Sequence, residues 1–138
     1  MDWKLEVIVI PVSDVDRAKE FYADKLGFPV DNDFSPNAHF RVVQVTPPGS
    51  ACSIVFGKGM GDGQPGSVQG NQFAVEDIQA AVAHLDAAGV EHSGVVHFED
   101  GAMTPGPDPQ DADYNSFVFF SDPDGNTWSA QKIRRHVR

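Results

Sequence analysis

The sequence VIPVSDVDRAKEFY, at residues 9–22, is matched 63 residues later by QFAVEDIQAAVAHL, at residues 72–85. In both copies an apolar run leads to a short polar residue, Ser13 or Asp14 in the first copy and Asp77 in the second. Such a residue starts a helix because its side-chain oxygen accepts hydrogen bonds from free N–H groups of the first turn. The chain therefore contains one internal repeat, and each copy is predicted to be a strand that leads into an amphipathic helix.

Apolar residues follow each cap at helical spacing, and a glycine then marks the end of each helix. The predicted buried faces are Val15, Ala18, Tyr22 and Leu26 before Gly27, and Ile78, Ala81, Val82 and Leu85 before Gly89. Strand-like runs come after each helix: HFRVVQVT and CSIVFG in the first half, and GVVHF, SFVFF and TWSAQKI in the second. The two halves thus share one order of elements: a strand, a helix and then further strands.

Two irregular segments interrupt this order. The first, residues 57–70, reads GKGMGDGQPGSVQG; it has no GK[ST] run and no helix opens from it, so it is predicted to be a flexible linker rather than a phosphate-binding loop. The second, residues 99–115, carries five acidic residues, three prolines and no base, which is typical of a surface loop. It is either a lid over a site or a solvated excursion without a role.

The composition limits the class of protein. With 138 residues, 41% of them hydrophobic, the chain is long enough for one well-buried core, and we expect a single domain. A formal net charge of -10 disfavours nucleic acid and anionic lipid surfaces as partners. No run approaches the roughly 20 apolar residues of a membrane span, and the opening MDWKLEVIVIPV lacks the features of a signal peptide. We therefore expect a soluble, cytoplasmic protein that does not bind membranes.

The single cysteine and the basic tail add little to this picture. Cys52 cannot form an internal disulfide, and its apolar setting in SACSIVFG predicts a buried structural thiol rather than a nucleophile. The basic residues gather at the end of the chain, in QKIRRHVR. A solvated terminus is the preferred interpretation of that tail over a local anion or subunit contact.

Two longer motifs carry a resemblance to a known family. PVSDVDRAKEFYADKLGF, at residues 11–28, and FFSDPDGN, at residues 119–126, resemble motifs of the vicinal oxygen chelate superfamily, which includes glyoxalase I, extradiol dioxygenases and bleomycin resistance proteins. The resemblance extends from Leu5 to Ile133 and implies an α+β fold of paired βαβββ modules that form a half-barrel, completed in a homodimer. Module one then covers about residues 3–58, the linker 57–70, module two 69–133 and the basic tail 134–138.

The resemblance also implies four metal ligands that point inward from four strands. In this sequence the four positions fall on Val7, Gly70, Ser129 and a residue near Val55, with Ile54 or Phe56 as alternatives if the register shifts by one. A divalent metal needs imidazole or carboxylate donors, and a serine hydroxyl alone is a weak ligand. We therefore predict neither a metal nor another cofactor.

Strand alternation predicts which side chains line a cavity, because successive residues point to opposite faces. The apolar face toward the helices consists of Ile8, Ile10 and Val12 in the first half, and of Phe73 and Val75 in the second. The opposite faces give six predicted ligand-binding residues: Val7, Val9, Val55, Gln72, Ser129 and Gln131. Gln72 and Gln131 are the favoured hydrogen-bonding groups, since each amide has two donors and an acceptor. The alternative is that both glutamines face solvent on the open side of a sheet.

No residue is predicted to be catalytic with any strength. Of the histidines His39, His84, His92, His97 and His136, only His97 shares a strand face with a carboxylate, Glu99, that could look into the cavity. His97 and Glu99 are therefore weak candidates for a base. A metal cluster outside the family positions would need His39 to lie near His97.

Three functions remain open. The favoured one is a metal-free protein similar to bleomycin resistance proteins, which binds a small molecule in a cleft; the acidic surface suits a cationic ligand. The second is a glyoxalase-like lyase or isomerase that uses His97 or Glu99 as a base, or a metal at a different site. The third is a vestigial module without catalysis.

Overall fold

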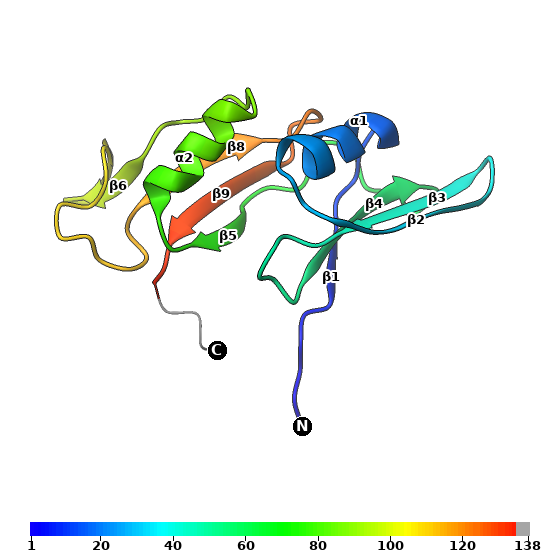
Figure 1. Ribbon diagram of the computed structural model, residues 1–138, viewed down its shortest axis with the longest axis horizontal. Coiled ribbons are helices and arrows are strands. Elements are labelled where there is room, and N and C mark those ends of the chain that lie inside the picture. Colours follow the sequence, from blue (N-terminus) through cyan, green and yellow to red (C-terminus); the bar gives the residue numbers. More distant parts are fainter. Residues whose placement is uncertain (135–138) are drawn as a thin grey trace. The chain divides into compact units, whose positions relative to one another are not determined.

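The contacts within the chain divide it into two units in the computed structural model, which describes residues 1–134 (Figure 1). The first unit contains Met1–Val68 and, from much later in the sequence, the turn Asp122–Asn126. The second unit contains Gln69–Ser121 and the segment from Thr127 onward. Of the predicted basic tail, residues 135–138, and with them His136, lie outside the described residues.

A four-stranded sheet with the order β1-β4-β3-β2, the first sheet, organises the first unit. Its strands are β1 (Val7–Val9), β2 (Val30–Asn37), β3 (Phe40–Val45) and β4 (Ser53–Lys58). β1 runs parallel to β4, and the other two pairs are antiparallel. Register partners share a face of a sheet, and one face is buried: it carries Val43, Val45, Ile54 and Phe56.

The helix of the first unit begins as α1 (Val15–Lys19) and widens into a π-helical turn, η1 (Glu20–Lys25). Of the two predicted caps, Asp14 is the actual one, because its Oδ1 accepts a hydrogen bond of 3.0 Å from the backbone N–H three residues on. The π-turn was not predicted. It coincides with the burial of two consecutive aromatic residues, Phe21 and Tyr22, where a regular helix would turn one of them away from the core.

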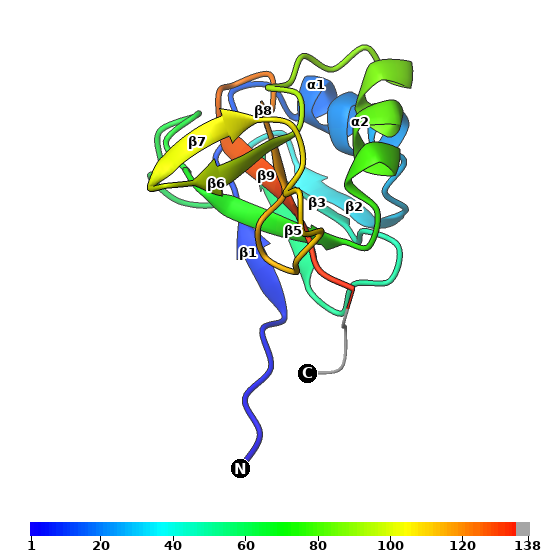
Figure 2. The ribbon, with the colours of Figure 1, turned by 90° about the vertical axis from the view of Figure 1, so that its left-hand side faces the viewer.

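A five-stranded sheet with the order β5-β9-β8-β6-β7, the second sheet, organises the second unit (Figure 2). Its strands are β5 (Asn71–Val75), β6 (Val96–Glu99), β7 (Ala102–Pro105), β8 (Phe117–Ser121) and β9 (Thr127–Lys132). The helix α2 (Ile78–Ala87) packs against β8 and β9. Asp77 caps α2 as predicted, since its Oδ1 accepts hydrogen bonds from two backbone N–H groups of the first turn.

The predicted α+β fold is confirmed, and two strands are additions to it. β2 was not predicted because it is polar, contains a proline and is exposed at all eight positions. The prediction that residues 99–115 form a loop without structure is wrong, because Ala102–Pro105 form the strand β7. Asp100 and Gly101 have φ values of 51° and 79°, as a two-residue hairpin turn requires, and they join β6 to β7. Neither helix in residues 1–134 is long or apolar enough to cross a lipid bilayer.

Several glycines of the predicted linker lie closely against other backbone. A side-chain Cβ on Gly59 would come within 2.5 Å of the carbonyl oxygen of His39, and one on Gly66 within 2.2 Å of that of Asp124. Such distances exclude any side chain at either position. These two glycines thus have a packing role in addition to the flexibility that the sequence predicts.

The turn Asp122–Asn126 is held in the first unit by buried hydrogen bonds. The Asp122 carboxylate accepts from the Tyr22 hydroxyl at 2.7 Å and from Asn126 Nδ2 at 2.8 Å, and it also accepts from two backbone N–H groups of the turn. Asn126 Nδ2 also donates to the carbonyl of Pro11 at 2.9 Å. The SDPDGN motif therefore fixes the end of β1 and the helix of the first unit through its side chains.

Charged groups on the surface of the first unit form a second, more exposed network. Asp124 accepts hydrogen bonds from the backbone and hydroxyl of Ser13 and from Arg17. Arg41 bridges two carboxylates, with Nη1 at 2.7 Å from Asp16 and Nη2 at 2.9 Å from Asp33. Arg41, and then Lys19, hold the pKa of the Asp33 carboxyl far below its usual range.

Candidate functional site

One face of the second sheet carries two of the predicted ligand-binding residues side by side. Gln72 is the register partner of Ser129, and Ser129 is the partner of Phe119 on the next strand. Register partners share a face, so Gln72, Ser129 and Phe119 lie together. Phe73 lies on the other face, where its ring stacks on Trp128 with a centroid separation of 4.6 Å. We call the first of these the open face of the second sheet.

A hollow of about 380 Å³ lies on the open face. Its lining includes Gly70, Gln72, Phe119, Thr127 and Ser129. Gln72 is exposed, whereas Ser129 is buried. The lining therefore combines an aromatic ring with neutral hydrogen-bonding groups and contains no charged side chain.

Exposed apolar side chains extend the open face beyond the hollow. Val96 pairs with Phe117, which places Phe98 on the same face, and Phe98 meets Phe117 edge to face at 6.0 Å. Phe117 in turn stacks against Phe119 at 5.9 Å. Phe98 is 52% exposed, Phe119 39% and Met103, the register partner of Phe98, 41%. Contiguous exposed aromatic surface of this kind is typical of a binding site.

The sequence did not identify this aromatic row. SFVFF is apolar at four of its five positions, so its own pattern does not show which side chains are exposed. The neighbouring strand TWSAQKI does alternate, with Thr127, Ser129 and Gln131 at the polar positions. Its pairing with β8 assigns Phe117 and Phe119 to the polar side. That pairing was the missing signal.

Gln131 also lies on the open face, but its amide already has a partner. Its Nε2 donates to the carbonyl of Tyr114 at 3.1 Å. The side chain is half-buried and does not line the hollow. Gln72 is therefore the better placed of the two glutamines to meet a ligand.

The three predicted valines lie in the first unit. Val9 is the register partner of Val55, and Val7 precedes it on the same face of β1. Val9 is 50% exposed, Val7 is half-buried and Val55 is buried. These valines form an apolar patch with the stem of Gln44, the partner of Val55 on β3. That any of the six residues binds a ligand stays a prediction.

The positions at which the resemblance implies metal ligands do not fit a metal. Val7, Val55 and Gly70 have no donor atom, and the Ser129 hydroxyl is neutral. Gly70 has a φ of +84°, which a residue with a Cβ rarely adopts, although nothing lies within 4 Å of a Cβ placed there. Within residues 1–134 no group of three or more His, Cys, Asp or Glu side chains is placed to hold a metal ion.

His97 and Glu99 lie on the opposite face of the second sheet from Gln72 and Ser129, because Phe98 between them points to the open face. The interpretation that they look into the predicted cavity is therefore wrong. His97 is buried, its Nδ1 donates to the carbonyl of Gly106 at 2.6 Å, and its Nε2 lies 3.6 Å from Glu99. These contacts tie β6 to the segment that follows β7.

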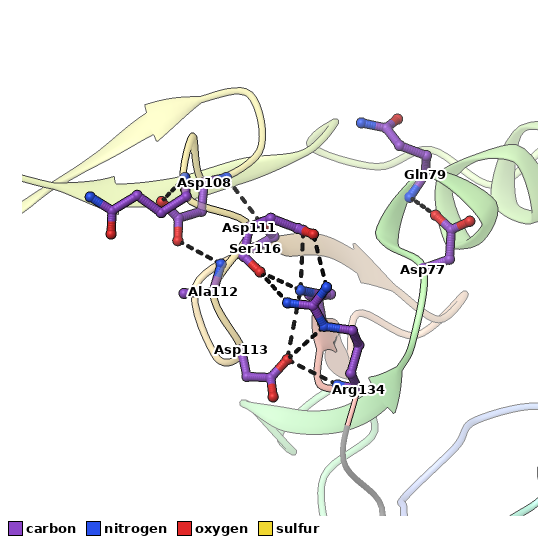
Figure 3. A network of polar contacts seen from close by, with 10 residues as sticks. Asp77, Gln79, Asp108, Asp111, Ala112, Asp113, Ser116 and Arg134 are labelled. Carbon is purple, nitrogen blue, oxygen red and sulfur yellow. Dashed lines mark hydrogen bonds and ion pairs between the residues drawn. The ribbon is translucent and has the colours of Figure 1, made fainter.

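That segment, residues 106–115, is fastened to the end of β9, and we call it the strap (Figure 3). The buried Lys132 places its Nζ 2.6 Å from the carbonyl of Asp111 and 3.1 Å from the carboxylate of the same residue. Arg134 donates to Asp111 and, through its backbone N–H, to Asp113. This backbone bond, together with nearby Lys132 and Arg134, lowers the pKa of Asp113. Two acidic residues of the strap, Asp111 and Asp113, thus have specific basic partners.

Cys52 lies just before β4 and is half-buried rather than fully buried as predicted. Partial burial, and then the negative charge of Glu6, raise the pKa of its thiol. The thiolate fraction at neutral pH is therefore small, which agrees with a structural rather than a nucleophilic cysteine.

The chain is similar to known proteins over most of its length. The family model described as Glyoxalase/Bleomycin resistance protein/Dioxygenase superfamily matches residues 4–130. A solved structure of TnmS3, described as an antibiotic binding protein from Streptomyces sp. CB03234, is 30% identical, with 95% of this chain and 96% of that chain covered and a TM-score of 0.74.

Two further relatives are similar over nearly their full lengths. A member of the same superfamily from Sphaerobacter thermophilus DSM 20745 is 27% identical, with 96% of this chain and 98% of that chain covered and a TM-score of 0.73. The protein YetH of Bacillus subtilis (strain 168), described as uncharacterized, is 27% identical over 126 residues, which are 91% of this chain and 94% of YetH.

Proposed function

The chain belongs to the glyoxalase/bleomycin resistance protein/dioxygenase superfamily, and we propose that it is a member that binds a small molecule on the open face of the second sheet without a metal. One observation carries the proposal: the hollow lined by Gln72, Phe119 and Ser129 opens beside the exposed rings and thioether of the same face. A pocket with apolar walls and a few polar groups is the common form of a small-molecule site.

The chemistry of the face favours a flat, aromatic ligand. The exposed rings of Phe98 and Phe119 both pack against the buried ring of Phe117, and a planar ligand gains similar contacts from the two exposed rings. Gln72 and Ser129 supply neutral donors and acceptors, which bind carbonyl, hydroxyl or amine groups of a ligand without demanding an opposite charge. The net charge of -10 disfavours anionic ligands. We therefore propose a neutral or cationic polycyclic ligand, part of which fills the hollow of about 380 Å³.

The likeness to TnmS3 supports this ligand class, because that protein is described as binding an antibiotic. For the first unit taken by itself, we propose that the patch of Val7, Val9 and Val55 also contacts a small molecule through apolar surface. We also propose that the protein is a cytoplasmic homodimer. Sheets that end in exposed edges are protected by pairing between copies.

The direct test is a titration with planar probes of known charge. Isothermal titration with 9-aminoacridine, a cation, and with acridone, its neutral counterpart, should show saturable binding. The substitution Phe119→Ala should weaken binding by about tenfold, because one stacked ring contributes about 1–1.5 kcal/mol. Gln72→Ala should weaken the binding of acridone, which has a carbonyl, more than that of 9-aminoacridine.

Phe34→Ala is the matched control, because Phe34 is also 52% exposed but lies on β2 of the first sheet. Equal losses from Phe34→Ala and Phe119→Ala would mean non-specific adsorption to exposed rings and would overturn the proposed site. Absence of saturable binding by both probes at millimolar concentration would overturn the ligand class.

A further inference from the structure

A cavity of about 800 Å³ lies within the first unit, and all of its lining residues fall in the range 9–68. Its wall consists of the end of β1, the start of the first helix, the hairpin of β2 and β3, and the loop after β4. Ligand pockets commonly have volumes of about 300–1,000 Å³. We call it the first-unit cavity; it is separate from the hollow on the open face, which the second unit forms.

One base on the wall of the first-unit cavity has no acidic partner. Lys58 is the register partner of Arg41, so two positive side chains lie opposite each other on neighbouring strands, where like charges repel. Arg41 is neutralised, with Nη1 2.7 Å from Asp16 and Nη2 2.9 Å from Asp33. Lys58 forms no ion pair or hydrogen bond with any residue that the structure describes. An anionic group of a ligand therefore gains most beside Lys58.

The loop after Lys58 adds hydrogen-bond donors to this end of the cavity. Met60, Gly61 and Gly63 belong to the lining, and their backbone N–H groups donate to no acceptor in the described part of the chain. A Cβ placed on Gly61 would meet nothing within 4 Å, so the backbone there is open to a ligand. Asp62, the acidic residue of this loop, is not part of the lining. Backbone N–H groups close together in a loop bind oxyanions such as carboxylates.

An acid lines the same cavity from the start of the first helix. Asp14 accepts the N–H of Arg17 at 3.0 Å through Oδ1, whereas its Oδ2 has no partner within residues 1–134. Overall the wall carries two acidic and two basic side chains, which balance in charge. A zwitterion matches such a wall. Because a zwitterion has no net charge, the formal charge of -10 on the chain does not repel it.

Apolar side chains complete the lining, and all four of them are at least partly exposed: Val9, Val12, Phe40 and Met60. We propose that the first-unit cavity binds a short apolar peptide or a similar zwitterion. Its carboxylate lies at Lys58 and the loop N–H groups, and its ammonium group lies at Asp14. A dipeptide spans roughly 7 Å, which a cavity of this volume accommodates. The cavity shares Val9 with the valine patch of the first unit, but the proposal does not depend on the ligand of the open face.

Isothermal titration with the dipeptide leucyl-phenylalanine tests the carboxylate end. Lys58→Gln should weaken binding by about tenfold, because it removes a charge-assisted hydrogen bond. The C-terminal amide of the dipeptide should bind the unchanged protein about tenfold more weakly and should not respond to Lys58→Gln. Lys25→Gln is the matched control, since Lys25 is an exposed lysine of the same unit outside the lining. Equal losses from Lys25→Gln and Lys58→Gln would overturn the assignment of the carboxylate to Lys58.

The N-acetyl dipeptide tests the ammonium end in the same way. Asp14→Asn removes the charge but keeps a good helix cap, so the fold is preserved. This variant should bind leucyl-phenylalanine several-fold more weakly and should not distinguish it from its N-acetyl form. Equal binding of the free, acetylated and amidated dipeptides by the unchanged protein would exclude recognition of a zwitterion.

Amide NMR shifts locate the dipeptide in the full chain. Leucyl-phenylalanine should shift the amide signals of Met60, Gly61 and Gly63. Shifts confined to Phe117 and Phe119 would place the dipeptide on the open face and overturn the first-unit cavity as its site. Absence of saturable binding at millimolar concentration would overturn the ligand class. Neither outcome affects the proposal for the open face, which the titrations with 9-aminoacridine and acridone test separately.

Discussion

Tyr22 and Leu85 occupy equivalent positions in the two repeats, yet they anchor their helices by different interactions. Both are buried, at 0% and 4% exposure. The Tyr22 hydroxyl donates to Asp122 at 2.7 Å, and Asp122 in turn accepts from Asn126. Leu85 contributes only apolar contact to a core in which Phe73 stacks on Trp128.

The difference shows that one order of elements can be stabilised in two ways. The first unit includes a turn from a distant part of the sequence, and directional hydrogen bonds fix how that turn meets the helix. The second unit has no such insertion, so packing of α2 on β8 and β9 is sufficient. β8 carries apolar side chains on both of its faces. Two of them, Phe117 and Phe119, lie on the open face rather than on the face that packs against α2.

The largest effect is expected when the tyrosine of the first repeat is placed at the equivalent position of the second repeat, Leu85. Leu85→Tyr should lower the free energy of unfolding by about 4 kcal/mol, because it overpacks the core and buries a hydroxyl that no equivalent of Asp122 receives. Urea denaturation measures this. Leu85→Phe is the control for volume alone and should cost about 2 kcal/mol. Equal costs for the two variants would show that the second core does accommodate a hydroxyl.

Removal of the Asp122 carboxylate, which accepts the hydrogen bond from the Tyr22 hydroxyl, should have the next largest effect. Asp122→Ala takes away the acceptor of four hydrogen bonds and should cost about 3 kcal/mol. Hydrogen exchange should locate the loss in the first unit, at the amides of Val68 and Asn126. Asp124→Ala, which removes the acceptor of three hydrogen bonds from Ser13 and Arg17, should cost less, about 2 kcal/mol. Loss of protection spread equally over α2 would contradict the division between the two anchors.

Tyr22→Phe should have a smaller effect, about 1.5 kcal/mol, since it removes one hydrogen bond and no packing. Tyr22→Leu, which copies the second repeat, should cost about 3 kcal/mol, because it adds a cavity. Thermal unfolding distinguishes them. A stability for Tyr22→Phe equal to that of the unchanged protein would mean that the hydroxyl is not what anchors the first helix.

The exposed ion pairs of the first unit should give the smallest effect, visible mainly in acid. The pKa of Asp33 is lowered in the folded chain by Arg41 and then Lys19, so its contribution is present above the unfolded pKa of about 3.9 and is lost as pH falls below it. Arg41→Met should cost about 0.5–1 kcal/mol at pH 7. Denaturation at pH 7 and pH 2.5 should show a cost that shrinks in acid; a cost independent of pH would exclude this coupling.

Local signals in the sequence predicted much of the fold. Asp77 and the glycine ends of both helices follow from hydrogen bonding within a few residues, and the repeat located them. The exposed strand β2 and the short β7 lack an apolar pattern, so pairing with neighbours defines them. The pair Asp100 and Gly101 is typical of a two-residue hairpin turn and could have predicted β7. It was missed because the acidic residues of the segment favoured a surface loop.

The candidate site was predictable only in part, for a related reason. The period of two in β9 placed Ser129 on the polar face, and the repeat placed Gln72 on the face opposite Phe73 and Val75; the pairing of β5 with β9 brings these two residues together. The uniformly apolar β8 has none, so the position of Phe119 depended on its pairing. The placement of His97 failed because it depended on the register of β6 against β8, which the sequence does not specify.

Gly70 differs in its backbone from the other three positions at which the resemblance implies metal ligands. Three of the four positions could regain a donor by one substitution each, at Val7, Val55 and Ser129, on ordinary strand backbone. At Gly70, in contrast, a histidine or glutamate at a φ of +84° would carry about 1–3 kcal/mol of strain before any metal bound. A metal ligand at position 70 would therefore require a different backbone at the entry to β5 as well as a different side chain.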